Sequence, residues 1–91
     1  MITRDEIISA TGFYFSHYDE YDSSEVYRSH KNKNHIINRY DDNFYINLCD
    51  NPGTRGGYFS TSSTGKSIKT VKELLIVIEY LMFLKNEKKD E

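Results

Sequence analysis

Three histidines and one cysteine are the side chains in this sequence best suited to bind a soft metal ion or to act as a nucleophile: His17, His30, His35 and Cys49. Zinc sites usually take two ligands from one turn, through a C-x2-C or an H-x3-H pair. Neither pair is present. A lone cysteine also cannot form an internal disulfide, which is typical of a protein kept in a reducing compartment. We therefore predict no metal site and a cytoplasmic location.

One short motif is typical of nucleotide binding. Thr64-Gly65-Lys66-Ser67 matches the end of the phosphate-binding loop G-x-x-x-x-G-K-[ST], but Ser60 occupies the position of the first glycine. That loop also joins a parallel strand directly to a helix, and here Ile68-Lys69-Thr70 intervenes before the next helix signal. The motif is better interpreted as a polar turn, and we predict no cofactor.

A second pattern resembles a catalytic family. His35, followed by Asn47-Leu48-Cys49, resembles the core of the HNH nucleases, whose metal-binding ββα unit uses a histidine as general base. Asn34 stands where that family has an aspartate, and no helix signal follows Cys49. No Ser/His/Asp or Cys/His set is supported by spacing either, so we expect no catalytic residue and no enzymatic activity.

Carboxylates are concentrated in one segment, at Asp19, Glu20, Asp22 and Glu25. They lack the glycine and the ligand order of a calcium-binding EF-hand loop. Two interpretations remain open, a solvated acidic turn or a contact site for a protein partner.

The aromatic residues form the most regular pattern. Phenylalanine and tyrosine stand side by side in Phe13-Tyr14-Phe15, Phe44-Tyr45 and Tyr58-Phe59. Neighbouring side chains of a strand point to opposite faces of the sheet, so each pair sends a Phe one way and a Tyr the other. This predicts an apolar face and a face of tyrosine rings, which are enriched at protein interfaces. The predicted contact face comprises Tyr14, Tyr45 and Tyr58, with Tyr18 and Tyr27 as additions. The alternative is that the rings only cover a half-exposed sheet.

The elements that carry these residues define an α+β protein. Thr3 and Glu6 form a capping box that predicts a helix over 4–10, ended by Gly12. Strand patterns follow at 13–18, 25–30, 35–40, 44–49 and 56–62, and Asp50-Asn51-Pro52-Gly53 predicts a turn. The second and third patterns are weak, so we predict an antiparallel meander of three to four strands. A second capping box, Thr70 to Glu73, opens a long helix from 71 to about 86 that packs on the sheet, and 86–91 is a frayed tail. The whole chain, 1–91, reads as a single domain.

The long helix has apolar residues on two sides. At 100° per residue, one stripe faces the sheet and comprises Val71, Leu74, Leu75, Ile78, Leu81 and Met82. A second stripe comprises Ile76, Tyr80 and Phe83, with Val77 and Leu84 beside it. Three things could pack on this second stripe: the N-terminal helix through Ile7 and Ile8, a second copy of the chain, or a foreign partner. We predict the second copy, that is, a homodimer. The apolar run from Leu74 to Leu84 is too short for a membrane span.

Basic residues are concentrated as well. Residues 28–40 and 51–72 each carry four Lys or Arg and no carboxylate, although the net charge is −2. If the two segments met, they would form a nucleic-acid-binding patch. The order of strands and helix is similar to that of plant AP2-like and integrase arm-binding domains, which lay a sheet in the major groove. The residues that would contact phosphates are Arg28, Lys31, Lys33, Arg39, Arg55, Lys66 and Lys69. The acidic isoelectric point, about 5.9, argues against this alternative.

We expect a small, non-catalytic protein-binding module that acts as a homodimer. The abundance of Ile, Lys, Asn, Tyr and Phe, which A/T-leaning codons encode, is typical of low-GC bacteria and their phages. Small one-domain proteins of such origin are often inhibitors or regulators of a host or defence protein. The sequence favours that function, with the tyrosine face or the acidic turn as the site for the partner.

Overall fold

The computed structural model describes residues 1–49 and 57–89, with side chains as far as residue 83. The predicted turn at 50–53 and Arg55 lie outside the described residues. The elements, in order, are α1 (Arg4–Thr11), β1 (Tyr14–Tyr18), β2 (Glu25–Arg28), β3 (Ile36–Tyr40), β4 (Asn43–Asn47), β5 (Tyr58–Ser60), α2 (Thr61–Thr64) and α3 (Val71–Lys89). The strands form one antiparallel sheet in the order β1-β2-β3-β4-β5. The predicted α+β class is confirmed, with five strands in the meander.

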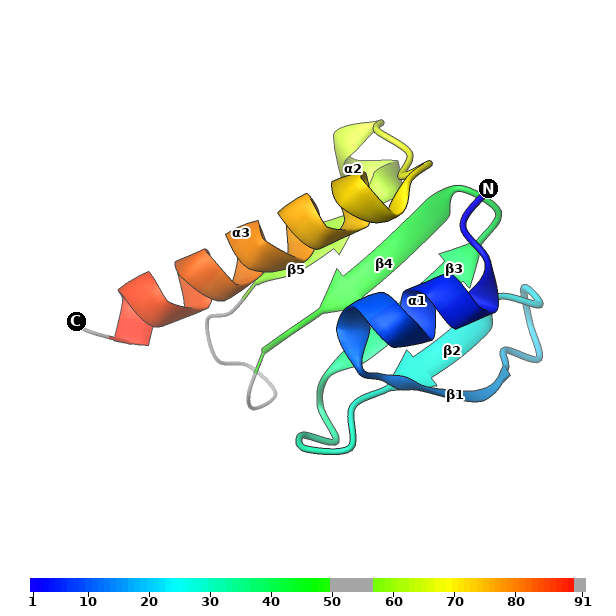
Figure 1. Cartoon of the computed structure of the whole chain (residues 1–91), viewed down its shortest axis with the longest axis horizontal. Coiled ribbons are helices and arrows are strands. Elements are labelled where there is room, and N and C mark those ends of the chain that lie inside the picture. The colour runs from blue at the N-terminus through cyan, green and yellow to red at the C-terminus, as the bar shows by residue number, and fades with distance from the viewer. Residues whose placement is uncertain (50–56, 90–91) are drawn as a thin grey trace.

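The sheet has a helix layer on one face only. Figure 1 shows α1 and α3 in front of the sheet, α1 over its first strands and α3 along β4 and β5. The short helix α2, which the sequence did not predict, lies beside β4 and β5 at the entry to α3. The opposite face of the sheet, called the outer face below, carries no helix among the described residues.

One row of side chains across all five strands forms the centre of the core. The register pairs Phe15 with Tyr27, Tyr27 with Ile37, Ile37 with Ile46, and Ile46 with Phe59. Tyr27, Ile37 and Ile46 are fully buried, and the two phenylalanines at the sheet edges pack against them half-buried. Because the row is continuous, the register of every strand pair is fixed by burial.

The predicted starts of the two helices, and Gly12 as the residue that ends the first, are confirmed. The Thr3 hydroxyl accepts a hydrogen bond from the Glu6 amide at 3.2 Å, and the Glu6 carboxylate accepts one from the Thr3 amide at 2.9 Å. Gly12 ends α1 in the left-handed region, with φ of 73°. At α3 the Glu73 amide donates to the Thr70 hydroxyl at 3.1 Å. Thr11 is the last helical residue of α1, one beyond the predicted end, and α3 continues to Lys89, beyond the predicted end near 86.

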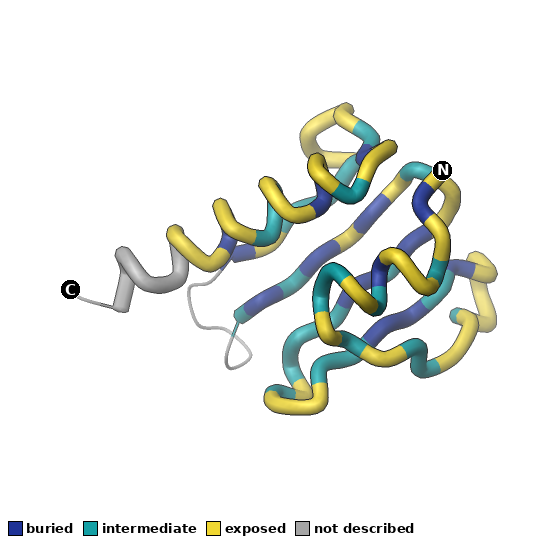
Figure 2. The backbone as a smooth tube through the Cα atoms, viewed as in Figure 1, coloured by how far each residue is buried: buried dark blue, intermediate teal, exposed yellow. Residues whose placement is uncertain are grey.

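The face of α3 that packs on the sheet is narrower than the sequence predicted. Leu74 and Leu81 are buried, with Val77 beside them half-buried, whereas Leu75 and Met82 are 37% and 38% exposed. The assignment of Leu75 and Met82 to the packed stripe, and of Val77 to the second stripe, was therefore wrong. Figure 2 shows the alternation of buried and exposed turns along α3. The helix α3 packs along one edge of the sheet, so the residues on both flanks of its packed stripe stay accessible to solvent.

Candidate functional site

The outer face of the sheet carries aromatic and polar side chains in a second continuous row. Register pairs join Tyr14, Arg28, Ile36, Asn47 and Tyr58 in that order, from β1 to β5. Tyr14 is 39% exposed and Tyr58 is 61% exposed, and the three residues between them are half-buried. This row is one position away from the core row, so the predicted alternation of Phe and Tyr across the sheet is found at β1, β4 and β5.

The exposed tyrosines share a face without forming one cluster. Tyr45 and Tyr58 are neighbours on β4 and β5, with ring centroids 6.5 Å apart. Tyr14 lies at the other edge, four strand spacings or about 19 Å from Tyr58, where its ring packs against His30 at 4.6 Å. The site with the most aromatic surface is thus the β4–β5 end of the outer face.

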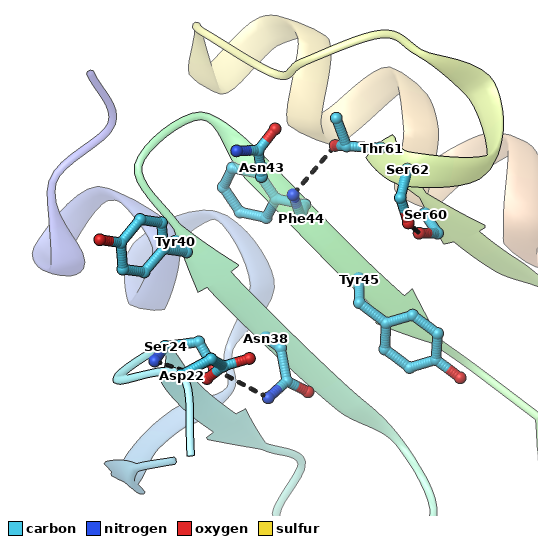
Figure 3. Close-up of a pocket in the computed structure, with 10 residues that line it drawn as sticks. All are labelled: Asp22, Ser24, Asn38, Tyr40, Asn43, Phe44, Tyr45, Ser60, Thr61 and Ser62. Carbon is cyan, nitrogen blue, oxygen red and sulfur yellow. Dashed lines mark hydrogen bonds between the residues drawn. The ribbon is translucent and has the colours of Figure 1, made fainter. Parts of the chain in front are cut away.

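A groove of about 440 Å³ opens at that end of the sheet (Figure 3). It is lined by the β1–β2 loop, β3, β4, β5 and α2, through Asp22, Ser24, Asn38, Tyr40, Asn43, Phe44, Tyr45, Ser60, Thr61 and Ser62. The rings of Tyr40 and Tyr45 lie on either side of the groove in Figure 3, and amide and hydroxyl groups lie between them. The structure therefore joins the predicted acidic turn, through Asp22, to the predicted tyrosine face, through Tyr45.

Hydrogen bonds hold the walls of the groove. The Phe44 amide donates to the Thr61 hydroxyl at 3.0 Å, which fixes α2 against β4. The Asn38 side-chain amide donates to the Ser24 hydroxyl at 3.4 Å, and the Ser60 and Ser62 hydroxyls are 2.7 Å apart. These residues supply hydrogen-bond donors and acceptors beside aromatic rings, an arrangement suited to recognition.

The acidic loop is ordered by its own carboxylates. Asp19 Oδ1 accepts hydrogen bonds from the amides of Tyr21 at 2.8 Å and Asp22 at 3.3 Å. Asp22 Oδ1 accepts from the Ser24 amide at 2.9 Å, and the hydrogen bonds from Ser24 lower the pKa of the Asp22 carboxyl. Glu20 is exposed on the same loop. Asp22 therefore presents a charged carboxylate at the edge of the groove, while Asp19 has a structural part in the turn.

Tyr18 does not lie where alternation along β1 predicts. The register of β1 on β2 shifts between Phe15 and His17, so Ser16 is an extra residue, a β-bulge. Beyond the bulge the faces are exchanged, and the Tyr18 ring packs against Phe15 on the helix side of the sheet, at 5.1 Å. Arg4 donates a short hydrogen bond to its hydroxyl. Tyr18, although 56% exposed, is not part of the outer face.

Tyr27 and Arg39 were predicted to be accessible, and both predictions were wrong. Tyr27 is fully buried and Arg39 is 6% exposed. Both bind Glu25 Oε1, which accepts hydrogen bonds from the Tyr27 hydroxyl at 2.6 Å and from Arg39 Nε at 2.8 Å. Arg4 approaches Glu25 Oε2 at 3.4 Å from α1 and stacks over the Phe15 ring at 3.9 Å. Sequence reasoning missed this network because its members come from separate elements.

The network shifts two pKa values. Burial disfavours a charged Glu25, but the hydrogen bonds from Tyr27 and Arg39 and the charge of Arg39 outweigh it and lower the pKa of Glu25. Burial, and then the hydrogen bond to the Glu25 carboxylate, raise the pKa of Tyr27 to about 12. Glu25 is therefore ionised, and it holds Arg39 in a buried ion pair. Arg39 cannot reach a phosphate from this position.

The described lysines of the two basic segments lie apart. Lys31 and Lys33 are exposed in the loop before β3, whereas Lys66 and Lys69 are exposed beyond its other end, where the Ile68 amide donates to the Asp42 carbonyl at 2.8 Å. The five residues of β3 place about 16 Å between these two pairs of lysines. Among the predicted phosphate contacts that the structure describes, Arg28 lies on the outer face, half-buried in its central row.

The second stripe of α3 is open to solvent. Ile76, Tyr80 and Phe83 are 56%, 60% and 61% exposed. The N-terminal helix does not cover them, because Ile7 is fully buried in the core and Ile8 packs against the same core. Of the three covers considered for this stripe, the intramolecular one is therefore wrong.

The chemical motifs of the sequence are dispersed in the fold. Within residues 1–49 and 57–89, no group of three or more His, Cys, Asp or Glu side chains is placed to hold a metal ion. Gly65 ends α2 in the left-handed region, so the motif from Thr64 to Ser67 begins at the last residue of a one-turn helix. In the same described residues, no helix is long and apolar enough to cross a membrane.

No protein-family model, curated protein or solved structure matches the chain.

Proposed function

We propose that the chain is a non-catalytic protein-binding module whose partner occupies the β4–β5 end of the outer face. The observation that carries this proposal is the groove itself, in which Asp22 from the acidic loop and Tyr45 from the tyrosine face line one opening. Tyr45 and Tyr58 offer rigid aromatic surface with hydrogen-bonding hydroxyls, the side-chain type most enriched in protein interfaces. Among the described residues, the one-turn helix α2 borders this face at the groove, and α1 and α3 lie on the other side of the sheet (Figure 1).

The chemistry of the groove specifies the partner's contact residue. Asp22 provides one negative charge, and the rings of Tyr40 and Tyr45 provide negative faces. Among the residues that the structure describes, no lysine or arginine lines the groove. A Lys or Arg side chain of the partner would pair with the Asp22 carboxylate and lie against the rings of Tyr40 and Tyr45. Apolar residues beside it in the partner would cover Tyr58. By the analogy with small phage-borne proteins, the partner is a bacterial host or defence protein that the chain inhibits or regulates.

The test compares variants of the full chain in pull-downs from a bacterial lysate, read by mass spectrometry. The double variant Tyr45→Ala/Tyr58→Ala and the variant Asp22→Asn should each lose proteins that the unchanged chain retains. Tyr21→Ala is the matched control, because Tyr21 is 93% exposed on the acidic loop and does not line the groove. A set of retained proteins that is the same for the control and the groove variants would refute the proposal.

The nucleic-acid alternative is decided by a separate titration. Random single-stranded and double-stranded DNA and RNA are offered to the full chain over a range of salt concentrations. Binding that weakens steeply with salt would replace the protein-partner proposal, because phosphate contacts release counterions. The separation of Lys31 and Lys33 from Lys66 and Lys69, and the burial of Arg39, favour an absence of such binding.

We further propose that a second copy of the chain covers the open stripe of α3. Ile76, Tyr80 and Phe83 are spaced by four and three residues, the spacing of a helix–helix contact. In a dimer with two-fold symmetry, each chain contributes the same stripe to the interface, so one exposed stripe on each chain is enough to form it. Burial of each of these side chains stabilises by roughly 1.5–3 kcal/mol, which is large for a domain of this size. This dimer leaves the outer face of the sheet open to the partner.

A further inference from the structure

A second cavity lies on the helix side of the sheet, where the end of α1 and the middle of α3 diverge. It encloses about 430 Å³ and is lined by Thr11, Gly12, Phe13, Ser29, His30, Lys31, His35, Ile37, Leu48, Ile78 and Met82. Ile37 and Leu48, on β3 and just after β4, are 0% and 3% exposed and form its apolar floor. Volumes of 300–1,000 Å³ are typical of small-molecule sites.

The walls of this cavity are apolar and its mouth is basic. Phe13, Ile78 and Met82 add apolar surface from the end of α1 and from α3. Of the lining residues that the structure describes, Lys31 carries a fixed charge, and it is exposed in the β2–β3 loop without an ion pair in that part of the chain. Within residues 1–49 and 57–83, no aspartate or glutamate lines the cavity. The distribution suits a ligand with an apolar tail and an anionic head.

We propose that this cavity binds an amphipathic carboxylate with a single aliphatic chain, its tail over Ile37 and Leu48 and its head at Lys31. At about 30 Å³ for each water-sized group, the volume of about 430 Å³ holds roughly 14 non-hydrogen atoms, which is room for a ten-carbon carboxylate with its roughly 12 non-hydrogen atoms. A charge-assisted hydrogen bond from an ammonium group is the interaction that selects a carboxylate head over a neutral or cationic one.

The site is independent of the surfaces proposed above. Successive α3 residues are 100° apart, so Ile78 points away from Ile76 and Tyr80 on the helix surface. A dimer through Ile76 and Tyr80 therefore leaves the cavity accessible. None of the lining residues belongs to the outer-face groove. Failure of ligand binding would leave the protein-partner proposal standing, and the reverse also holds.

The test titrates decanoate into the full chain below its micelle concentration, followed by NMR chemical shifts and calorimetry. Saturable binding at one site is expected, with shifts centred on Leu48 and Ile78. Decylamine, which has the same tail and the opposite charge, should bind at least about five-fold more weakly, as should acetate, which lacks the tail. Decanoate that does not saturate, or decylamine that binds equally well, would overturn the proposal.

Two matched variants test the head-group contact. Lys31→Glu should weaken decanoate binding about five- to ten-fold, because an attraction becomes a repulsion. Lys33→Glu makes the same change two residues away, outside the cavity lining, and should stay within about two-fold of the unchanged chain. Equal losses in the two variants would contradict a contact at Lys31. A third variant, Ile78→Phe, fills the cavity and should abolish binding in protein whose circular dichroism is unchanged. If that variant does not fold, the lysine pair decides.

Discussion

Arg39 and Glu25 form an ion pair with a nitrogen–oxygen distance of 2.6 Å beneath the helix layer, and Arg39 is only 6% exposed. Removal of Arg39 leaves the Glu25 carboxylate with the Tyr27 hydroxyl and with Arg4 at 3.4 Å, and loss of one partner of a buried pair is more costly than the pair itself is favourable. We predict that Arg39→Ala lowers the free energy of unfolding by about 3 kcal/mol in urea titrations.

Two controls separate the charge effect from a simple truncation. Arg28→Ala, at a half-buried position of the outer face, should cost about 0.5 kcal/mol or less. The double variant Arg39→Met/Glu25→Gln replaces both charges and should recover more than half of the loss. A double variant as unstable as Arg39→Ala alone would show that packing, and not the unpaired carboxylate, determines the cost.

Tyr27 should give the protein an alkaline limit of stability. Its pKa is raised from 10.0 to about 12 by burial and by the hydrogen bond to Glu25. Between pH 10 and 12 the unfolded chain releases this proton while the folded chain keeps it. The contribution to stability is therefore complete below pH 10 and is lost as the pH rises towards 12. We predict a free energy of unfolding that falls by about 1 kcal/mol for each pH unit in this window.

The variant Tyr27→Phe checks this assignment in thermal unfolding at a series of pH values. It should be less stable at neutral pH, because Glu25 loses a donor, and it should show a flatter decline above pH 10. Tyr45→Phe, an exposed tyrosine of the outer face, should retain the decline. A decline of the same slope in Tyr27→Phe would mean that another group carries it.

The alternation of Phe and Tyr shows what sequence reasoning could predict here. It placed Tyr14, Tyr45 and Tyr58 on the outer face because each stands beside a phenylalanine whose burial fixes the parity of its strand. The antiparallel meander and the two longer helices were also within reach of local signals, namely capping boxes, turns and period-two patterns, although we predicted three to four strands and the sheet has five. These signals depend on residues that are close in sequence.

The failures have equally specific causes. Tyr18 was misplaced because one extra residue, Ser16, exchanges the faces of β1, and no turn residue marks it. On β2 both Val26 and Tyr27 suit a buried position, and both are buried, so local apolarity could not select the core-facing residue. On the core side the Tyr27 hydroxyl donates to Glu25, which in turn is paired with Arg39, so the buried ring keeps a hydrogen-bond partner there. The groove and the cavity depend on contacts between distant segments, which no local pattern encodes.

Gly57, the residue before β5, lies directly against α3. A Cβ atom at this position would lie 2.6 Å from both the Cβ and the carbonyl oxygen of Leu81 and 2.8 Å from its Cα. Two of these three atoms belong to the backbone, so the helix itself would have to move. We predict that Gly57→Ala destabilises by about 3 kcal/mol in urea titrations, or prevents folding.

Gly65→Ala is the matched control for that prediction. Gly65 has a φ of 72°, and a Cβ atom there meets no heavy atom within 4 Å. Gly65→Ala therefore lowers the free energy of unfolding only through the strained backbone conformation, by about 1 kcal/mol. Equal destabilisation by the two substitutions would show that β5 does not rest closely on α3.

The open stripe of α3 gives the sharpest prediction about assembly. Light scattering should report two chains of 10.7 kDa for the unchanged protein and one for Tyr80→Glu, because a charge in the centre of an apolar helix contact cannot be buried without a partner. Tyr80 is 60% exposed, so the folded monomer should tolerate the glutamate, and circular dichroism checks this. Tyr21→Glu, at a 93% exposed position of the acidic loop, should leave the mass at two chains. A Tyr80→Glu protein of unchanged mass would contradict the dimer and leave the stripe to a foreign partner.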